Sequence, residues 1–294
     1  MSLQPIVPPE IATWVQVKSV LIVDDDPAHS DMLCAMLSRA DRFVYTAFCV
    51  AQAEEMLRSR CFDLVLLELF LPDGHGAELL RQFAAPGSKT RFVVVTRDES
   101  SSSVVEAMRC GAYDLMRKPF VLDDIRDWID VWLESPPDDD IELISMKPYW
   151  VEMSIPCSGK AVDRAGRFLS NLQSDLPADF RDQLTDCFHE LALNAVEWGG
   201  NFDVKKRVYI SYLRTARLIQ FRITDPGNGF RFDQLSHAAV GQLSPDPLAY
   251  ARIRAEKGLR PGGLGLLIVR SLADDLVYNE TQNEVVFLKH LPEV

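Results

Sequence analysis

The segment 225–229 places a carboxylate and two alternate glycines directly after a predicted strand. Glycine adopts backbone angles that are closed to other residues and lets a ligand approach the main chain closely. The carboxylate of Asp225 can accept a hydrogen bond from an amino group such as the one on adenine. Gly227 and Gly229 therefore suggest a nucleotide-binding loop, although an ordinary turn after a strand has the same composition.

Two other motifs lie on either side of this loop in the sequence. Glu190 and Asn194 are four residues apart in a segment with helical character, so they share one face of a helix. Gly263 and Gly265 open an apolar helical segment, and the backbone N–H groups at the start of a helix bind phosphate. Each motif is common by itself, but their succession in this order is not.

From about residue 149 to the C-terminus, these motifs resemble the ATP-binding domain that histidine kinases, gyrase and MutL share, the GHKL (HATPase) or Bergerat fold. The resemblance implies that Asn194 coordinates Mg²⁺ between the ATP phosphates and that Glu190 acts as general base on the substrate hydroxyl. It also implies that Asp225 binds the adenine amino group. The glycines that would contact ATP are Gly227 and Gly229, at the base and ribose, and Gly263 and Gly265, at the phosphates.

Within this family the chain looks more closely like the anti-sigma-factor serine kinases of bacterial partner-switching systems. Such kinases phosphorylate a STAS-domain anti-anti-sigma protein and sequester a sigma factor, often as homodimers. The resemblance thus predicts a cytoplasmic protein serine/threonine kinase that uses ATP and Mg²⁺. The alternative is a non-catalytic ATP-binding switch or scaffold, and Glu190 favours the kinase because transfer needs a base and binding does not. An ATP-hydrolysing machine like gyrase or MutL would need an additional transducer domain.

The elements predicted for this half form an α+β sandwich, with helices on one face of a mixed sheet. The long connection after residue 230 would be a lid over ATP, in which Lys257 and Arg260 are either phosphate ligands or surface charges. The predicted strands are 149–155, 206–213, 217–224, 275–279 and 284–290, and the predicted helices are 160–173, 179–198 and 264–274.

In the first half of the chain, short apolar runs alternate with helical segments over residues 18–134. Continuous apolar strands that alternate with helices predict a doubly wound, five-stranded parallel sheet of flavodoxin-like type. The predicted strands are 19–23, 43–47, 64–67, 91–95 and 113–117, and the predicted helices are 27–40, 51–60, 76–84, 101–110 and 122–133.

Functional residues of such a sheet lie beyond the carboxyl ends of its strands. The sequence places Asp24, Asp25, Glu68, Thr96 and Lys118 at these ends. Acidic groups, a hydroxyl and a lysine at one mouth could hold Mg²⁺ and a phosphoryl group, and Asp25 is a candidate Mg²⁺ ligand. These residues resemble the CheY-like receiver domain of two-component response regulators, with Thr96 as the switch hydroxyl.

Glu68 stands where the resemblance places the phosphoacceptor aspartate. Its extra methylene moves the carboxylate outward, and a misplacement of about 1 Å costs about 100-fold in a positioned reaction. Three alternatives follow: Glu68 imitates the phosphorylated state, the domain is a degenerate docking or dimerisation module, or Glu68 is itself phosphorylated. The aromatic switch position, three residues before Lys118, is Leu115, although Tyr113 is near.

Residues 135–147 are predicted to link the two domains, the receiver over 18–134 and the ATPase over 148–294. Two prolines and three aspartates favour an extended, solvated segment. The linker is too short for the helical dimerisation region and phosphoacceptor histidine of a histidine kinase. His189 is therefore expected to be an ordinary helix residue.

The composition sets further limits on function. A length of 294 residues suggests about two domains, and a net charge of -12 argues against a nucleic-acid-binding surface. The six cysteines form no Cys-x-x-Cys pair, which predicts reduced, buried thiols in a cytosolic protein. Residues 1–17 lack a signal-peptide pattern, and no window approaches 18 consecutive apolar residues, so no membrane association is expected.

Overall fold

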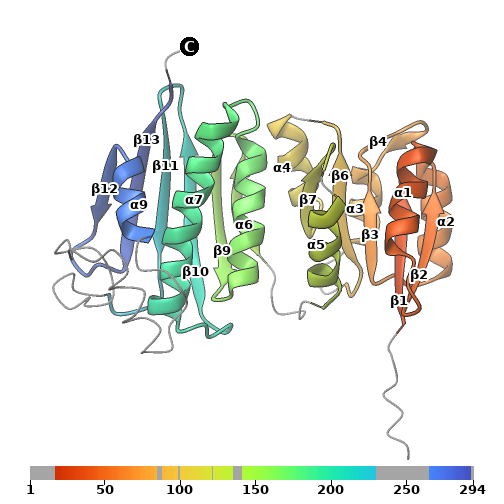
Figure 1. Cartoon of the computed structure of the whole chain (residues 1–294), viewed down its shortest axis with the longest axis horizontal. Helices are drawn as coiled ribbons and strands as arrows, with labels where there is room; N and C mark the ends of the chain where they lie inside the picture. The colour runs from red at the N-terminus through yellow and green to blue at the C-terminus, as the bar shows by residue number, and fades with distance from the viewer. Residues whose placement is uncertain are drawn as a thin grey trace, which may run out of the picture.

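The computed structural model describes two layered α/β units that lie side by side (Figure 1). The N-terminal unit is coloured from red to yellow-green, and the C-terminal unit from green to blue. The parts of the chain that the structure describes are residues 17–84, 88–98, 100–120, 122–134, 141–229 and 265–292.

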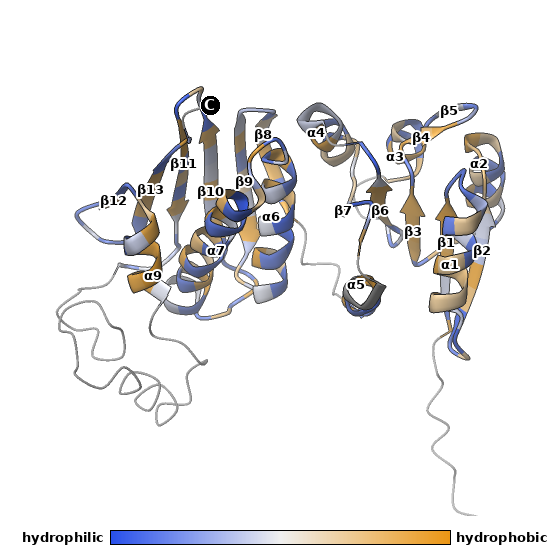
Figure 2. Cartoon of the chain, turned by 45° about the horizontal axis from the view of Figure 1, so that its top comes forward, coloured by the Kyte–Doolittle hydropathy of each residue, from blue (hydrophilic) through white to orange (hydrophobic). Residues whose placement is uncertain are grey.

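The N-terminal unit is built on a five-stranded parallel sheet in the order β2-β1-β3-β6-β7. Its central strands are buried on both faces, and Figure 2 shows β3 and β6 in the colour of hydrophobic residues. The predicted doubly wound, five-stranded parallel sheet is thereby confirmed. The strands are β1 (Lys18–Val23), β2 (Arg42–Ala47), β3 (Leu64–Leu67), β6 (Arg91–Thr96) and β7 (Asp114–Arg117).

Five helices cover the two faces of this sheet. The apolar cluster on one face contains side chains of α1 and α5, and the cluster on the other contains side chains of α2, α3 and α4. The helices are α1 (Pro27–Leu37), α2 (Val50–Ser59), α3 (Ala77–Phe83), α4 (Ser101–Arg109) and α5 (Leu122–Glu134).

A two-residue hairpin, β4 (Phe70–Leu71) and β5 (Gly74–His75), follows β3. The sequence analysis missed it, because a pattern of alternating side chains needs a longer strand to be visible. Helix α1 also ends three residues before the predicted boundary, at Leu37. Such differences at element ends are ordinary, since local signals fix the existence of an element better than its last residue.

The C-terminal unit contains a six-stranded sheet in the order β12-β13-β11-β10-β9-β8. All neighbouring strands in it are antiparallel, so the predicted mixed sheet is wrong. A connection through one helix normally returns the chain parallel, but β9 and β10 are joined through two successive helices. The strands are β8 (Glu142–Lys147), β9 (Trp150–Pro156), β10 (Arg207–Arg214), β11 (Leu218–Thr224), β12 (Asp275–Tyr278) and β13 (Glu284–His290).

The helices of this unit lie on one face of the sheet, as predicted (Figures 1 and 2). Strand β10 shows the cause, since Val208, Ile210 and Tyr212 are buried toward the helices while Tyr209 points to solvent. The helices are α6 (Gly159–Leu172), α7 (Ala178–Asn194), the π-helix η1 (Ala195–Gly200) and α9 (Gly265–Leu272).

The predicted linker needs a correction in its second half. Residues 142–147 form β8, which pairs with β9 at the edge of the C-terminal sheet. The prolines and aspartates of 135–140 dominated the prediction, whereas six residues with weak alternation gave no strand signal. Residues 135–140 lie outside the described part of the chain.

The six cysteines are free thiols, but the predicted burial holds only for Cys157 and Cys187. Desolvation raises the pKa of Cys157 to about 11 and that of Cys187 to about 12, so both remain protonated, inert thiols. Cys61 is exposed, and the other three are half-buried.

Candidate functional site

Helix α7 carries the first predicted motif. Glu190 and Asn194 are both half-buried, whereas Leu191 and Ala192 between them are buried in the core. The structure therefore places the two polar side chains at the edge of the core on one helix. At Ala195 the α-helix changes into the π-helix η1, and such widened turns occur frequently at functional sites.

The carboxylate of Glu190 lies against the first glycine of helix α9. A Cβ atom at Gly265 would overlap Oε2 of Glu190 and would lie 2.6 Å from its Cδ. Only glycine is compatible with this contact, which brings together two motifs that are 75 residues apart in the sequence. The start of a helix carries partial positive charge, so a carboxylate is favourable in this position.

Asp225 follows the last residue of β11 and folds back onto its own loop. Its Oδ1 accepts a hydrogen bond of 2.7 Å from the Gly227 N–H, and its main-chain N–H donates to the Asn283 carbonyl. Burial raises the pKa of the Asp225 carboxyl above its ordinary value, partly opposed by the Gly227 hydrogen bond. Among the described residues Oδ2 has no hydrogen-bond partner, so this half-buried carboxylate can accept a ligand N–H.

The predicted loop glycines contact the protein itself. A Cβ at Gly227 would lie 2.8 Å from both Asp225 Oδ1 and Gly199 Cα. Gly229 has a φ of +80°, and a Cβ there would overlap the Thr281 carbonyl. Both glycines thus shape the loop, and their contact with ATP stays a prediction. Gly263, and the expected lid with Lys257 and Arg260, lie outside the described residues.

Helix α7 and η1 arrange these groups in a consistent order. Gly265 lies against Glu190, and Gly199, nine residues further along, is pressed against the carboxylate of Asp225. The two contacts are therefore about two helical turns apart. Gly265, which is predicted to contact the phosphates, therefore lies beside α7, and Asp225, which is predicted to bind adenine, lies beside the end of η1. This arrangement fits a bound ATP, as does Asp225 Oδ2, which accepts no hydrogen bond from the residues that the structure describes.

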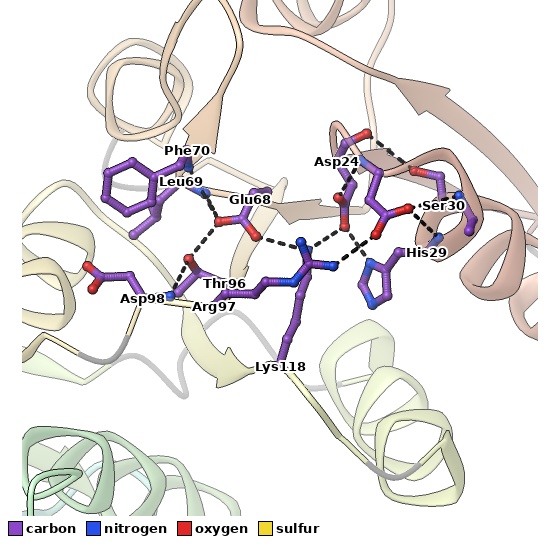
Figure 3. A network of polar contacts seen from close by, with 12 residues as sticks. Asp24, His29, Ser30, Glu68, Leu69, Phe70, Thr96, Arg97, Asp98 and Lys118 are labelled. Atoms are coloured by element: carbon purple, nitrogen blue, oxygen red, sulfur yellow. Dashed lines mark hydrogen bonds and ion pairs between the residues drawn. The ribbon is translucent and has the colours of Figure 1, made fainter.

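The predicted receiver residues come together at the carboxyl ends of the parallel strands (Figure 3). Asp24, Glu68, Thr96 and Lys118 have exposed fractions of 2%, 5%, 1% and 9%. The Lys118 ammonium donates to Asp24 Oδ2 at 2.7 Å and to Glu68 Oε2 at 2.8 Å. The Thr96 hydroxyl donates to Glu68 Oε1 at 2.6 Å, and the Leu69 N–H donates to the same oxygen. The Phe70 N–H also donates to Oε1, at 3.4 Å, so Glu68 is held by four donors.

Asp24 is bound by additional donors. His29 Nδ1 lies in contact with Asp24 Oδ2, and the Asp26 N–H donates to Oδ1 at 3.1 Å. Burial raises the pKa of the Asp24 carboxyl, but hydrogen bonds from His29 and Lys118 outweigh it and hold the pKa below its ordinary value. Asp24 is therefore ionised at neutral pH.

The structure does not bring Asp25 into this network, since its side chain is exposed. No group of three or more His, Cys, Asp or Glu side chains that could hold a metal ion is found among the described residues. Lys118 instead supplies positive charge to both Asp24 and Glu68. The Mg²⁺ position at Asp25 stays a prediction.

Some residues that shape these sites had no local signal. The predicted helix ended at residue 198, but η1 continues to Gly200, and the left-handed residues that follow are Asn201 and Phe202, with φ of +59° and +53°. Gly199 and Gly200 allow close approach of Asp225 and Cys157. His29 was also not predicted to touch Asp24, because its place on α1 gives no indication of its neighbours.

Comparisons with known proteins match both halves of the chain. Residues 20–130 match the model of the response regulator receiver domain, and residues 156–289 match that of the histidine kinase-like ATPase domain. The swarming motility regulation protein RssB of Serratia marcescens is 35% identical over 107 residues, which cover 36% of this chain and 49% of that protein. The response regulator MprA of Mycobacterium avium is 29% identical, over 66% of this chain and 87% of that protein.

The chain thus spans about half the length of RssB, and it matches 25% of the response regulator PilR of Pseudomonas aeruginosa, at 31% identity over 38% of this chain. Among solved structures, the BeF3-activated receiver domain of DrrB is 25% identical and matches over 40% of this chain and 99% of that one, with a TM-score of 0.37. A CheY-like receiver domain protein from Methanospirillum hungatei is 28% identical, covers 40% and 94%, and has a TM-score of 0.39.

The two domain matches and the two folds define a bacterial signalling protein with an ATP-binding domain. The chain is a response regulator receiver domain followed by a histidine kinase-like ATPase domain. Within the described part of the chain, no helix has both the length and the apolar character required to cross a bilayer.

Proposed function

We propose that this chain is an ATP-dependent protein serine kinase of the partner-switching type. The observation that carries the proposal is the order of groups along α7 and η1, with Glu190 against Gly265 and Gly199 against Asp225. Glu190 is a base beside the predicted phosphate site, and the Asp225 carboxylate can accept a hydrogen bond from the adenine amino group. Phosphoryl transfer requires such positioning of its reactants, together with charge neutralisation.

Each residue has a distinct role in this proposal. Asp225 accepts a hydrogen bond from the adenine amino group, and the Asn194 amide oxygen ligates Mg²⁺. Glu190 takes the proton of the substrate serine as the serine oxygen bonds to the γ-phosphorus and the bond to the β-phosphate oxygen breaks. ATP would supply the phosphoryl group, and Mg²⁺ held by Asn194 would neutralise the negative charge of the phosphates. The protein substrate would be a STAS-domain anti-anti-sigma protein, and a sigma factor or similar target would be sequestered, by a cytoplasmic and homodimeric kinase.

For the receiver domain, we propose that Glu68 imitates the phosphorylated state. Its carboxylate already accepts hydrogen bonds from the Thr96 hydroxyl and the Lys118 ammonium, the two groups that a phosphoryl group at this position would engage. The buried site needs no additional anion, because Glu68 uses both oxygens. The domain is therefore a pseudo-receiver that does not wait for a phosphodonor.

The test is calorimetric ATP binding with Mg²⁺, followed by a transfer assay with a STAS-domain protein. Wild type should bind ATP, Asp225→Asn should bind it weakly, and Glu190→Ala should bind it like wild type without transferring phosphate. Binding by wild type without transfer to any STAS substrate would leave a non-catalytic ATP-dependent switch. A wild type that binds no ATP would refute both functions.

A further inference from the structure

Helix α6 of the ATPase domain covers the free edge of the receiver sheet. Strand β7 is the last strand in its order, so one row of its main-chain carbonyls has no neighbouring strand. The Arg164 guanidinium donates to the Tyr113 carbonyl at 2.8 Å, and the Asn171 amide donates to the Leu115 carbonyl at 3.3 Å. Leu115 belongs to β7, and Tyr113 is the residue directly before this strand. Side chains of α6 thus donate hydrogen bonds to main-chain carbonyls that a neighbouring strand would otherwise engage.

Charged groups fix the same contact. Asp114, which is 2% exposed, accepts a hydrogen bond of 2.6 Å from Arg167 on α6 and one of 2.8 Å from the Trp132 indole on α5. Arg164, which is 4% exposed, lies 3.5 Å from the centre of the Tyr113 ring. A buried carboxylate and a buried guanidinium are tolerated only where they are paired, so the two domains need each other's side chains here.

A second contact lies at the edge of the other sheet. The Arg109 guanidinium on α4 donates to the Met146 carbonyl on β8, the edge strand of the ATPase sheet. One apolar cluster continues across the boundary and includes Met108 and Leu115 of the receiver together with Met146 and Leu169 of the ATPase domain. Each domain therefore covers a sheet edge of the other.

This interface begins opposite the Glu68 network. Thr96, whose hydroxyl binds Glu68, is the register partner of Arg117 in the β6–β7 pairing. The Arg117 guanidinium in turn donates to the Asn171 side-chain oxygen at 2.8 Å and to its main-chain carbonyl at 2.7 Å. The side chain that holds α6 therefore belongs to the β7 residue that is paired with Thr96 in the sheet.

On the side away from the receiver, α6 contacts α7, the helix that carries the candidate base Glu190. Asp163 on α6 lies 3.0 Å from His189 on α7, and His189 is the residue before Glu190. A groove of about 640 Å³ runs along α6, lined on one side by Phe120 and Trp128 and on the other by His189.

We propose that the receiver domain controls the ATP site through α6: the Glu68–Thr96 contact sets β7 and Arg117, Arg117 positions α6 through Asn171, and α6 positions the Glu190 segment of α7. The wild-type Glu68 holds this chain of contacts in one state. The consequence for nucleotide affinity rests on the proposed function, whereas the mechanical coupling does not.

The test is hydrogen–deuterium exchange on the full chain, comparing wild type with Thr96→Val, which removes the hydroxyl and keeps the shape of the side chain. We expect amide exchange in 159–172 and 185–194 to become about fivefold faster or more. Asn171→Ala should have the same effect, and the double variant should add little to either, since both changes interrupt one route.

The matched control is Thr90→Val. The Thr90 hydroxyl donates to the Phe62 carbonyl at 2.7 Å, at the opposite end of β6, so its loss should leave α6 unchanged. The proposal would be overturned if Thr96→Val accelerated amide exchange only within the receiver. It would also be overturned if Thr90→Val accelerated exchange in α6 as much as Thr96→Val does. ATP affinity is measured on the same proteins: a wild type without ATP binding would refute the kinase and leave the exchange result standing.

Discussion

The carboxylate of Glu190 occupies the space that the side chain of any residue other than glycine would need at position 265. Gly265→Ala should therefore push the Glu190 side chain out of its preferred rotamer and destabilise the fold by about 0.5–1.5 kcal/mol. Truncating Glu190 to alanine removes the overlapping atoms, so the double variant should recover most of this loss. Chemical unfolding of the two single variants and the double variant measures the coupling, and strictly additive losses would contradict the contact.

Asp225→Asn should separate ATP binding from stability. The amide keeps an oxygen for the Gly227 N–H but loses the charged acceptor for adenine, and hydrogen bonds to charged groups contribute about 1.5–3 kcal/mol. We therefore expect ATP affinity to fall about 10- to 100-fold in calorimetry. An unchanged affinity would place adenine elsewhere.

The same substitution should not destabilise the nucleotide-free protein at neutral pH. Burial raises the pKa of Asp225, so its contribution to stability is present below the unfolded pKa and is lost as the pH rises through the folded pKa. At pH 7 the carboxylate is charged, although burial disfavours its charged form. Asparagine is neutral, so the substitution removes the free-energy cost of burying this charge. Thermal unfolding of nucleotide-free protein should show a midpoint equal to or above that of wild type, and a lower midpoint would refute the argument.

Glu68 should not be modified by a small phosphodonor such as acetyl phosphate, because both of its oxygens are already bound by Thr96 and Lys118. Intact-mass spectrometry should find the wild-type mass unchanged. Glu68→Asp shortens the side chain, so the Thr96 hydroxyl loses its 2.6 Å acceptor and stability should fall by about 1 kcal/mol. A phosphate adduct at Glu68 in the wild type would favour the third alternative, in which this glutamate is the phosphoacceptor.

Lys118→Met should destabilise the receiver strongly, because it leaves two buried carboxylates without their ammonium partner. Breaking such a pair costs about 3–5 kcal/mol, whereas Lys18→Ala, at the more exposed pair with Asp63, should cost at most about 1 kcal/mol. Urea unfolding of both variants at pH 7 tests the difference, and similar losses would mean that Lys118 is not a buried partner.

The pH dependence of wild type should reflect Asp24. Since the folded pKa of Asp24 is lowered, its stabilising contribution is present above the unfolded pKa and is lost as the pH falls through the folded pKa. Lys118→Met removes one cause of the lowered pKa, so the variant should lose less additional stability than wild type when the pH falls below about 4. A parallel loss in both proteins would contradict this role of Lys118.

The amino-acid sequence by itself determined the order of elements and the residue types of both sites. Apolar runs alternating with helices predicted the parallel receiver sheet, and the strand ends located Asp24, Glu68, Thr96 and Lys118, because in such sheets functional residues lie at the carboxyl ends. The helical spacing of Glu190 and Asn194 was likewise visible locally. These features depend on side-chain periods of two and 3.6 residues, which short stretches of sequence reveal.

Only the tertiary structure decided which residues meet across long separations. Asp114 and Arg167 are 53 residues apart, and neither has a local pattern that identifies its partner. Strand β8 was hidden for a related reason, since an edge strand of six residues is stabilised by β9 and by the receiver rather than by its own sequence. The glycines at 199 and 265 could be seen in the sequence, but the carboxylates that require them became visible only when the helices were packed, because close approach is a property of two surfaces and not of one segment.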